Sequence, residues 1–92
     1  MTDGQNLLIL KALGEETRLR IFSMLRNGSM CACKIQEAFD ITQPTLSHHM
    51  KILCEAGIVC AEKRGKWTYY SIDCQALRDF VGFLSDTKCN RE

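Results

Sequence analysis

The sequence has no apolar run long enough to span a membrane, no internal repeat and no segment of low complexity. The apolar stretch near the start covers only residues 7–10, and residues 1–6 contain no basic side chain of the kind that opens a secretory signal. With 46% hydrophobic and 25% charged residues, the composition excludes a disordered or collagen-like chain. We therefore expect residues 1–92 to form one globular domain in the cytoplasm, without a membrane partner.

An excess of one charge is also lacking, because 12 lysines and arginines face 11 acidic residues and the formal net charge is +1. The distribution is less even than the total. Residues 41–70 hold four basic side chains against two glutamates, together with both histidines. This pattern indicates a modestly basic surface between neutral or acidic flanks, which a dimer would double.

Cysteine is abundant, with six residues in 92. An even number in a short chain can indicate the disulfide framework of a secreted protein. Because no secretory signal precedes these cysteines, we expect reduced thiols that are available for chemistry.

The spacing of apolar residues predicts five helices and two strands. The first helix covers about 7–13, and the second begins at Glu15 and ends before Gly28, with Leu19, Ile21, Phe22 and Leu25 on its buried stripe. A short third helix follows Cys31 and runs through Phe39. A fourth helix at about 43–56, strands at 58–63 and 67–72, and a last helix at 75–86 complete the order.

The fourth helix separates into two faces. Leu46, Met50 and Leu53 share one side at 100° per residue, and polar residues occupy the other. Thr42 is the expected N-cap, and Pro44 falls in the first turn, where its missing N–H costs nothing. A tight turn at residues 64–66 joins the two strands. The fold class is therefore mainly α with a β-hairpin: a winged helix-turn-helix with about five helices, a recognition helix at about 43–56 and a two-stranded antiparallel wing at about 58–72.

The polar face of the fourth helix has the composition expected of a helix in the major groove of DNA. Gln43, Thr45, Ser47 and His48 are suited to base edges or phosphates, and Lys51 behind them is suited to a phosphate. Arg64 and Lys66 flank a glycine at the hairpin turn, where they can reach the DNA backbone or minor groove. His49 borders the apolar stripe, which favours packing or hydrogen bonding over base contact. The predicted partner is double-stranded operator DNA.

Signatures of an enzyme are lacking. The chain has no Cys-x-x-Cys, no phosphate-binding loop and no Cys–His–Asp arrangement, and both histidines lie on the predicted recognition helix. We therefore predict no enzymatic activity and no permanent cofactor.

Five segments of the chain together match a known pattern: Glu16-Thr17-Arg18-Leu19, residues 30–35 (MCACKI), residues 43–53 (QPTLSHHMKIL), Ala56-Gly57-Ile58-Val59 and residues 64–70 (RGKWTYY). With these segments the chain resembles the ArsR family over roughly residues 7–72. That resemblance implies a small homodimeric winged-helix repressor that leaves DNA when it binds a toxic metal or metalloid. It also implies dimerisation through the first and last helices, and an operator-facing position for Gln43, Thr45, Ser47 and His48.

Cys31 and Cys33 fall where arsenic-responsive relatives carry a Cys-x-Cys pair, so the resemblance implies a thiol site for As(III) or Sb(III) as inducer. Residues i and i+2 lie about 200° apart on a regular helix and cannot bind one atom. They can do so only if Cys31 precedes the first helical turn or the turn distorts. Formation of the site would then strain the start of the third helix, which is expected to pack on the recognition helix.

The third ligand of such a site is open. Several arsenic repressors carry another cysteine three residues after the second, and this chain has Gln36 there. Water, a buffer thiol, or one of four other cysteines can fill the position: Cys54, Cys60, Cys74 or Cys89.

Other sensors on the same scaffold remain alternatives. Soft thiolates also bind cadmium, lead and bismuth. The cadmium and lead sensors of the family, however, add cysteines from an N-terminal extension, and residues 1–30 contain none. Zinc and nickel sensors use the last helix, where Asp73, Asp79 and Asp86 occur without a histidine. A thiol redox or sulfide sensor is a further alternative, although a disulfide between Cys31 and Cys33 would be strained.

Overall fold

The computed structural model describes residues 2–86, and these form five helices and three strands. Side chains cap four of the five helices, and the N-cap of the remaining one, Cys31, forms no capping hydrogen bond through its side chain. The first helix begins at Asp3, earlier than the predicted start at about residue 7. The side chains of Thr2, Thr42 and Asp73 accept hydrogen bonds from backbone N–H groups of the first turns of α1, α4 and α5, and Glu15 does the same for α2. The order is α1 (Asp3–Leu13), α2 (Glu16–Leu25), β1 (Met30–Cys31), α3 (Ala32–Phe39), α4 (Gln43–Glu55), β2 (Val59–Arg64), β3 (Trp67–Ile72) and α5 (Cys74–Ser85).

The predicted two-stranded wing is present as the β2–β3 hairpin. It pairs from Val59↔Ile72 to Arg64↔Trp67 around a two-residue turn in which Gly65 has a φ of 65°. The sheet has one strand more than predicted, because β1 pairs with β3 through Met30↔Tyr70 and Cys31↔Tyr69, giving the order β1-β3-β2. Two residues are too few to show the alternation that identifies a strand in a sequence. The additional strand fixes the start of α3 to the middle of the hairpin.

The apolar stripe of α4 lies in the core as predicted, with Leu46, Met50 and Leu53 each at most 2% exposed. The prediction for α2 was wrong at one position. Ile21 and Leu25 are buried, whereas Leu19 is 50% exposed. Residues 19 and 21 lie about 200° apart on a helix and cannot share one face. The face that contains Ile21 and Leu25 packs on α1 and α4, and Leu19 points away from it.

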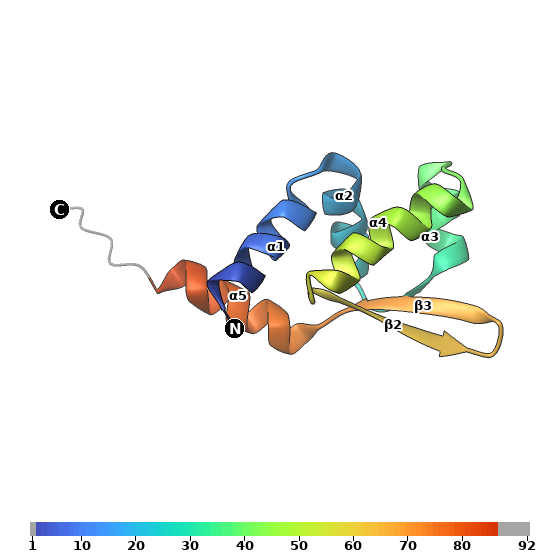
Figure 1. Cartoon of the computed structure of the whole chain (residues 1–92). Coiled ribbons are helices and arrows are strands. Elements are labelled where there is room, and N and C mark those ends of the chain that lie inside the picture. The colour runs from blue at the N-terminus through green and yellow to red at the C-terminus, as the bar shows by residue number, and fades with distance from the viewer. Residues whose placement is uncertain (1, 87–92) are drawn as a thin grey trace.

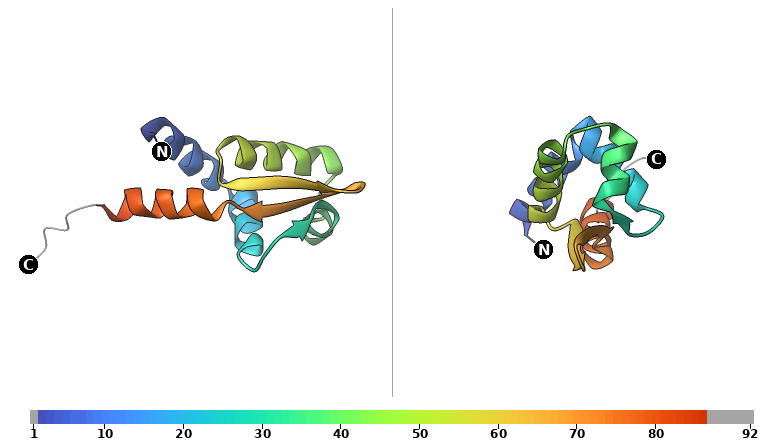
Figure 2. Two further views of the ribbon diagram at one scale, coloured as in Figure 1. Left: turned by 90° about the horizontal axis from the view of Figure 1, so that it is seen from below. Right: turned by 90° about the vertical axis from the view of Figure 1, so that its right-hand side faces the viewer.

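The hairpin turn lies at one end of the molecule, and α5 extends towards the other end. Figures 1 and 2 show α4 beside the hairpin, with the N-terminal end of α4 and the hairpin turn at the same end of the molecule. At the other end, α5 extends away from the hairpin (Figure 1), and its residues from Val81 onward are exposed. Large apolar side chains remain exposed on α1 (Leu7, Leu8 and Leu10) and on α5 (Val81, Phe83 and Leu84). None of the helices within residues 2–86 has the length and apolar character needed to cross a bilayer.

Candidate nucleic-acid interface and thiol site

The N-terminal half of α4 presents a polar surface of short side chains. Gln43, Thr45, Ser47, His48 and Lys51, which the sequence predicted to face DNA, are all exposed. The amide of Gln43 donates a hydrogen bond to Ser47 Oγ at 2.9 Å, and the hydroxyl of Thr42 donates to Thr45 Oγ1 at 2.9 Å. These bonds order the polar groups in the first turns. A helix with such an end can enter a major groove without a bulky obstruction.

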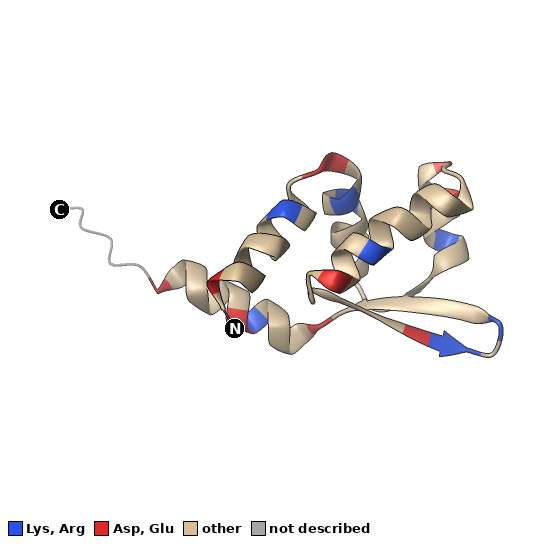
Figure 3. Cartoon of the chain, in the orientation of Figure 1, with Lys and Arg blue, Asp and Glu red and all other residues tan. Residues whose placement is uncertain are grey.

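The hairpin places basic side chains at its turn (Figure 3). Arg64 donates two hydrogen bonds to Glu62 Oε1, at 3.1 and 2.9 Å, and its guanidinium lies 4.4 Å from the centre of the Tyr69 ring. Lys66 Nζ lies 5.5 Å from the centre of the Trp67 ring. Because Arg64 already faces a carboxylate, Lys66 is the better placed of the two predicted phosphate ligands. Lys51 Nζ lies 4.0 Å from Glu55 Oε2, and this exposed ion pair contributes little to stability.

The structure brings the two sulfur atoms of Cys31 and Cys33 to 2.6 Å from each other. Cys31 is the N-cap of α3, with extended φ and ψ of −66° and 142°, because it also belongs to strand β1. The helical separation of about 200° therefore does not apply. Cys31 does precede the first helical turn, and this was the condition under which the two thiols could bind one atom.

The two thiols differ in acidity. The contact with Cys33 and the backbone N–H groups at the start of α3 hold the pKa of Cys31 below its ordinary value. The same contact raises the pKa of Cys33, and partial desolvation raises it further. Cys31 is therefore the more acidic thiol of the pair. Cys31 is buried and Cys33 is exposed, so an incoming ion first meets Cys33.

Among residues 2–86, no third histidine, cysteine or carboxylate joins the pair to make a group of three metal ligands. Cys54, Cys60 and Cys74 are free thiols elsewhere on the fold. Burial raises the pKa of both Cys54 and Cys60, and the Asp73 carboxylate raises that of Cys60 further. Gln36, next to Cys33, lines an open pocket with Glu37, Asp40 and Ile41. The remaining candidate, Cys89, lies outside the described residues.

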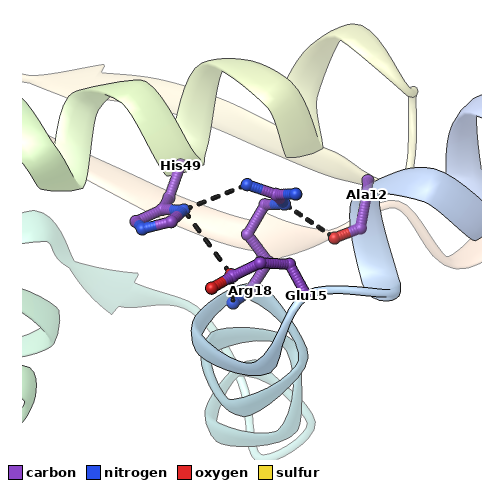
Figure 4. A network of polar contacts seen from close by, with 4 residues as sticks. All are labelled: Ala12, Glu15, Arg18 and His49. Atoms are coloured by element: carbon purple, nitrogen blue, oxygen red, sulfur yellow. Dashed lines mark hydrogen bonds and ion pairs between the residues drawn. The ribbon is translucent and has the colours of Figure 1, made fainter.

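Arg18, Glu15 and His49 form a polar network between α2 and α4 (Figure 4), of which the sequence predicted only the part of His49. Arg18 of α2 donates from Nη1 to His49 Nδ1 at 3.2 Å and from Nε to the Ala12 carbonyl at 2.8 Å. Glu15 Oε1 lies 3.8 Å from the same histidine nitrogen. The prediction that His49 packs or forms hydrogen bonds is confirmed, since its side chain is 14% exposed. The roles of Arg18 and Glu15 were missed because these residues precede His49 by 31 and 34 positions, and no local pattern links residues so far apart.

Comparison with known proteins agrees with this architecture. A family model described as "Bacterial regulatory protein, arsR family" matches residues 15–60. An uncharacterised HTH-type transcriptional regulator of Methanocaldococcus jannaschii is 44% identical over 85% of this chain and 89% of its own length. An arsenical resistance operon repressor of Staphylococcus aureus is 41% identical over 84% of this chain and 74% of its own.

A crystal structure of a possible transcriptional regulator for arsenical resistance superposes with a TM-score of 0.74. It is 29% identical and covers 82% of this chain and 78% of its own. Such a superposition supports the arrangement of five helices and hairpin described above.

Proposed function

Because the chain belongs to the ArsR family of bacterial transcriptional regulators, we propose that it is a homodimeric repressor that binds operator DNA and leaves it when Cys31 and Cys33 bind arsenite or antimonite. Release would derepress a metalloid-resistance operon. The observation that supports a two-thiol sensing site is the approach of the two sulfurs, 2.6 Å apart at the junction of β1 and α3. The choice of arsenite or antimonite as inducer follows the arsenical resistance operon repressors that the chain resembles.

The DNA-binding part of the proposal is supported by α4 and the hairpin. The exposed groups of Gln43, Thr45 and Ser47 suit base edges, and His48 and Lys51 continue the same face towards the phosphates. Arg64 and Lys66 at the hairpin turn add contacts to the backbone or minor groove. The exposed apolar side chains of α1 and α5 suit a two-fold interface, which would present two such surfaces to a palindromic site.

The sensing part is supported by the chemistry of the cysteine pair. Thiolates are soft ligands that prefer soft ions, and the Cys31 thiolate is favoured by the backbone N–H groups around it. Binding an ion to both sulfurs would require Cys33 to lose its proton and would link the N-cap of α3 to its second residue. Since α3 packs on α4, a shift of that turn changes the position of the recognition helix. Water or a thiol from solution can occupy the third position.

Two alternatives for the signal remain on the same scaffold. Cadmium, lead or bismuth could bind the same two thiolates. Oxidation or sulfide could instead act on the thiols. These alternatives share the DNA-binding part of the proposal and differ in the inducer alone.

An inducer titration tests the proposal. We expect arsenite or antimonite, at roughly one equivalent per protomer, to release the protein from a palindromic operator in a fluorescence anisotropy assay, with affinity lowered by about 10- to 100-fold. Cadmium in the same assay is the control ion. Release by cadmium but not by arsenite would assign the site to a soft divalent ion, and release by oxidant alone would assign it to redox sensing.

Replacement of Lys66 by alanine tests the hairpin contact. We expect Lys66→Ala to weaken binding to operator and unrelated DNA alike, by about 3- to 10-fold, and to reduce the salt slope by about one phosphate contact per protomer. Arg20→Ala is the matched control, because it removes the same charge from an exposed position of α2, where Arg20 pairs with Glu16. A salt slope unchanged in Lys66→Ala would remove the hairpin from the interface.

A further inference from the structure

One nitrogen of His49 faces a donor and an acceptor that compete for it (Figure 4). Arg18 Nη1 lies 3.2 Å from Nδ1, and Glu15 Oε1 lies 3.8 Å from the same atom. A guanidinium group can only donate hydrogen bonds, so Nδ1 must be unprotonated in this arrangement. The ring is therefore neutral, with its proton on Nε2.

Arg18 connects three helices through one side chain. It belongs to α2, it donates to the Ala12 carbonyl in the last turn of α1, and it donates to His49 in the middle of α4. In the proposed repressor, α1 contributes to the dimer interface and α4 contacts DNA. The angle between these two helices sets how two recognition helices of a dimer meet successive major grooves.

We infer that Arg18 is a positioning residue for the recognition helix and that its bond to neutral His49 makes operator affinity fall when His49 is protonated. This inference rests on the DNA-binding role proposed above. It concerns a proton at His49 and does not involve the cysteine pair.

Protonation of His49 Nδ1 would change its hydrogen-bond partner from the Arg18 guanidinium to the Glu15 carboxylate. A proton on Nδ1 would point at the Arg18 guanidinium, so two cations and two donors would face each other at 3.2 Å. The carboxylate of Glu15 would become the acceptor, and a rotation of the ring towards it breaks the link between α1 and α4. Glu15 is ionised for this role, since the hydrogen bond from the Arg18 backbone N–H lowers its pKa.

The surroundings keep His49 neutral near pH 7. Burial lowers the pKa of His49, and the charges of Arg18 and His48 lower it further, against an opposing effect of Glu15. The charged groups that face the ring are thus Glu15 and Arg18 from the α2 side and His48 from α4 itself, with the ring of His48 centred 5.9 Å away.

The expected fall of operator affinity in acid is opposite in direction to the effect of surface charge on DNA binding. Acidification adds positive charge and by itself strengthens binding to a phosphate backbone. Any positive charge gained on the DNA-facing side of α4 would act in that direction. A loss of affinity in acid is therefore not expected from surface charge.

The test compares operator affinity at about pH 8 and about pH 5.5, a range that spans the ordinary pKa of histidine. We expect wild-type protein to lose roughly tenfold in affinity on acidification. His49→Asn keeps an acceptor for Arg18 at the position of Nδ1 and cannot be protonated, so it should bind at both pH values with no loss in acid. His48→Asn is the matched control and should show a loss at least as large as that of wild type.

Two results of the affinity assay would overturn the inference alone. The first is wild-type affinity that stays constant or rises in acid, and the second is a loss in His49→Asn equal to that of wild type. In either case the DNA-binding proposal would stand. A wild-type protein that binds no operator at about pH 8 would contradict the proposed function and this inference together.

A measurement on the unaltered protein gives an independent test and requires no variant to fold. Protonation of His49 and operator binding are coupled reciprocally: if a proton on His49 weakens operator binding, operator binding must lower the pKa of His49. The NMR signals of the His49 ring, followed as a function of pH, measure this pKa. Nearby phosphates would raise the pKa of a histidine that only senses their charge. A His49 pKa that is unchanged or raised in the operator complex would overturn the positioning role.

Discussion

Cys31→Ser and Cys33→Ser should each abolish release of operator DNA by arsenite while leaving operator affinity within about threefold of wild type. A serine hydroxyl stays protonated near pH 7 and is a hard ligand, so one soft thiolate remains to bind the ion. With one sulfur ligand lost, the ion is no longer held by a second thiolate at high effective concentration. We therefore expect the arsenite concentration needed for release to rise by about 100-fold or more. Anisotropy titration of each variant on operator DNA measures both quantities.

The controls for this prediction come from the remaining described cysteines. Cys60→Ser and Cys74→Ser remove exposed thiols that the structure places away from the pair, and both should retain release at wild-type arsenite concentrations. Circular dichroism would check that each variant is folded. Release that persists in both Cys31→Ser and Cys33→Ser would move the sensing site elsewhere on the protein. Loss of release in Cys60→Ser or Cys74→Ser would identify a third ligand.

The sequence predicted those parts of the interface that depend on local chemistry. Thr42 caps α4, and Leu46, Met50 and Leu53 face the core, because capping and helical periodicity act within one or two turns. The hairpin pairing followed from β-branched and aromatic residues around Gly65. The exposure of the polar face of α4 then followed from the burial of the opposite face.

Features that depend on residues far apart in the chain could not be obtained in this way. The sequence showed only that Cys31 and Cys33 could bind one atom if Cys31 preceded the first helical turn. It could not show that this is so, because the extended backbone at Cys31 is set by pairing with Tyr69. Leu19 was assigned to the core because it is apolar, whereas the packing of α1 and α4 selects the face of Ile21 and Leu25. The bond between Arg18 and His49 likewise exists only in the folded chain.

The cysteine pair and the Arg18–His49 bond act on α4 from different neighbours. The pair lies at the start of α3, which packs on α4, and Arg18 approaches α4 from α2. In the proposed repressor, displacement of either neighbour would change the same quantity, the position of α4 relative to α1. Under both proposals, a metalloid signal and a proton signal would lower operator affinity independently, with contributions to the free energy of binding that are nearly additive if the sites do not share partners.

Val81→Asp should convert the proposed dimer into a monomer at micromolar protein concentration. Val81 is 51% exposed on the part of α5 that extends beyond the core, so an aspartate there costs the isolated protomer little. In a two-fold interface the same carboxylate would be buried twice against apolar side chains, which costs several kcal/mol. We expect the dissociation constant of the dimer to rise by about 100-fold or more.

Sedimentation equilibrium gives the mass directly, and operator affinity gives a second measurement. A monomer reaches one half-site at a time and loses the advantage of linked binding, so affinity for a palindromic operator should fall by about 100-fold or more. Trp67→Asp is the matched control for mass, because Trp67 is 48% exposed on the hairpin, away from α1 and α5. We expect Trp67→Asp to remain a dimer. If Val81→Asp also keeps the mass of a dimer, the exposed face of α5 is not the interface, and the two recognition helices must be related in another way.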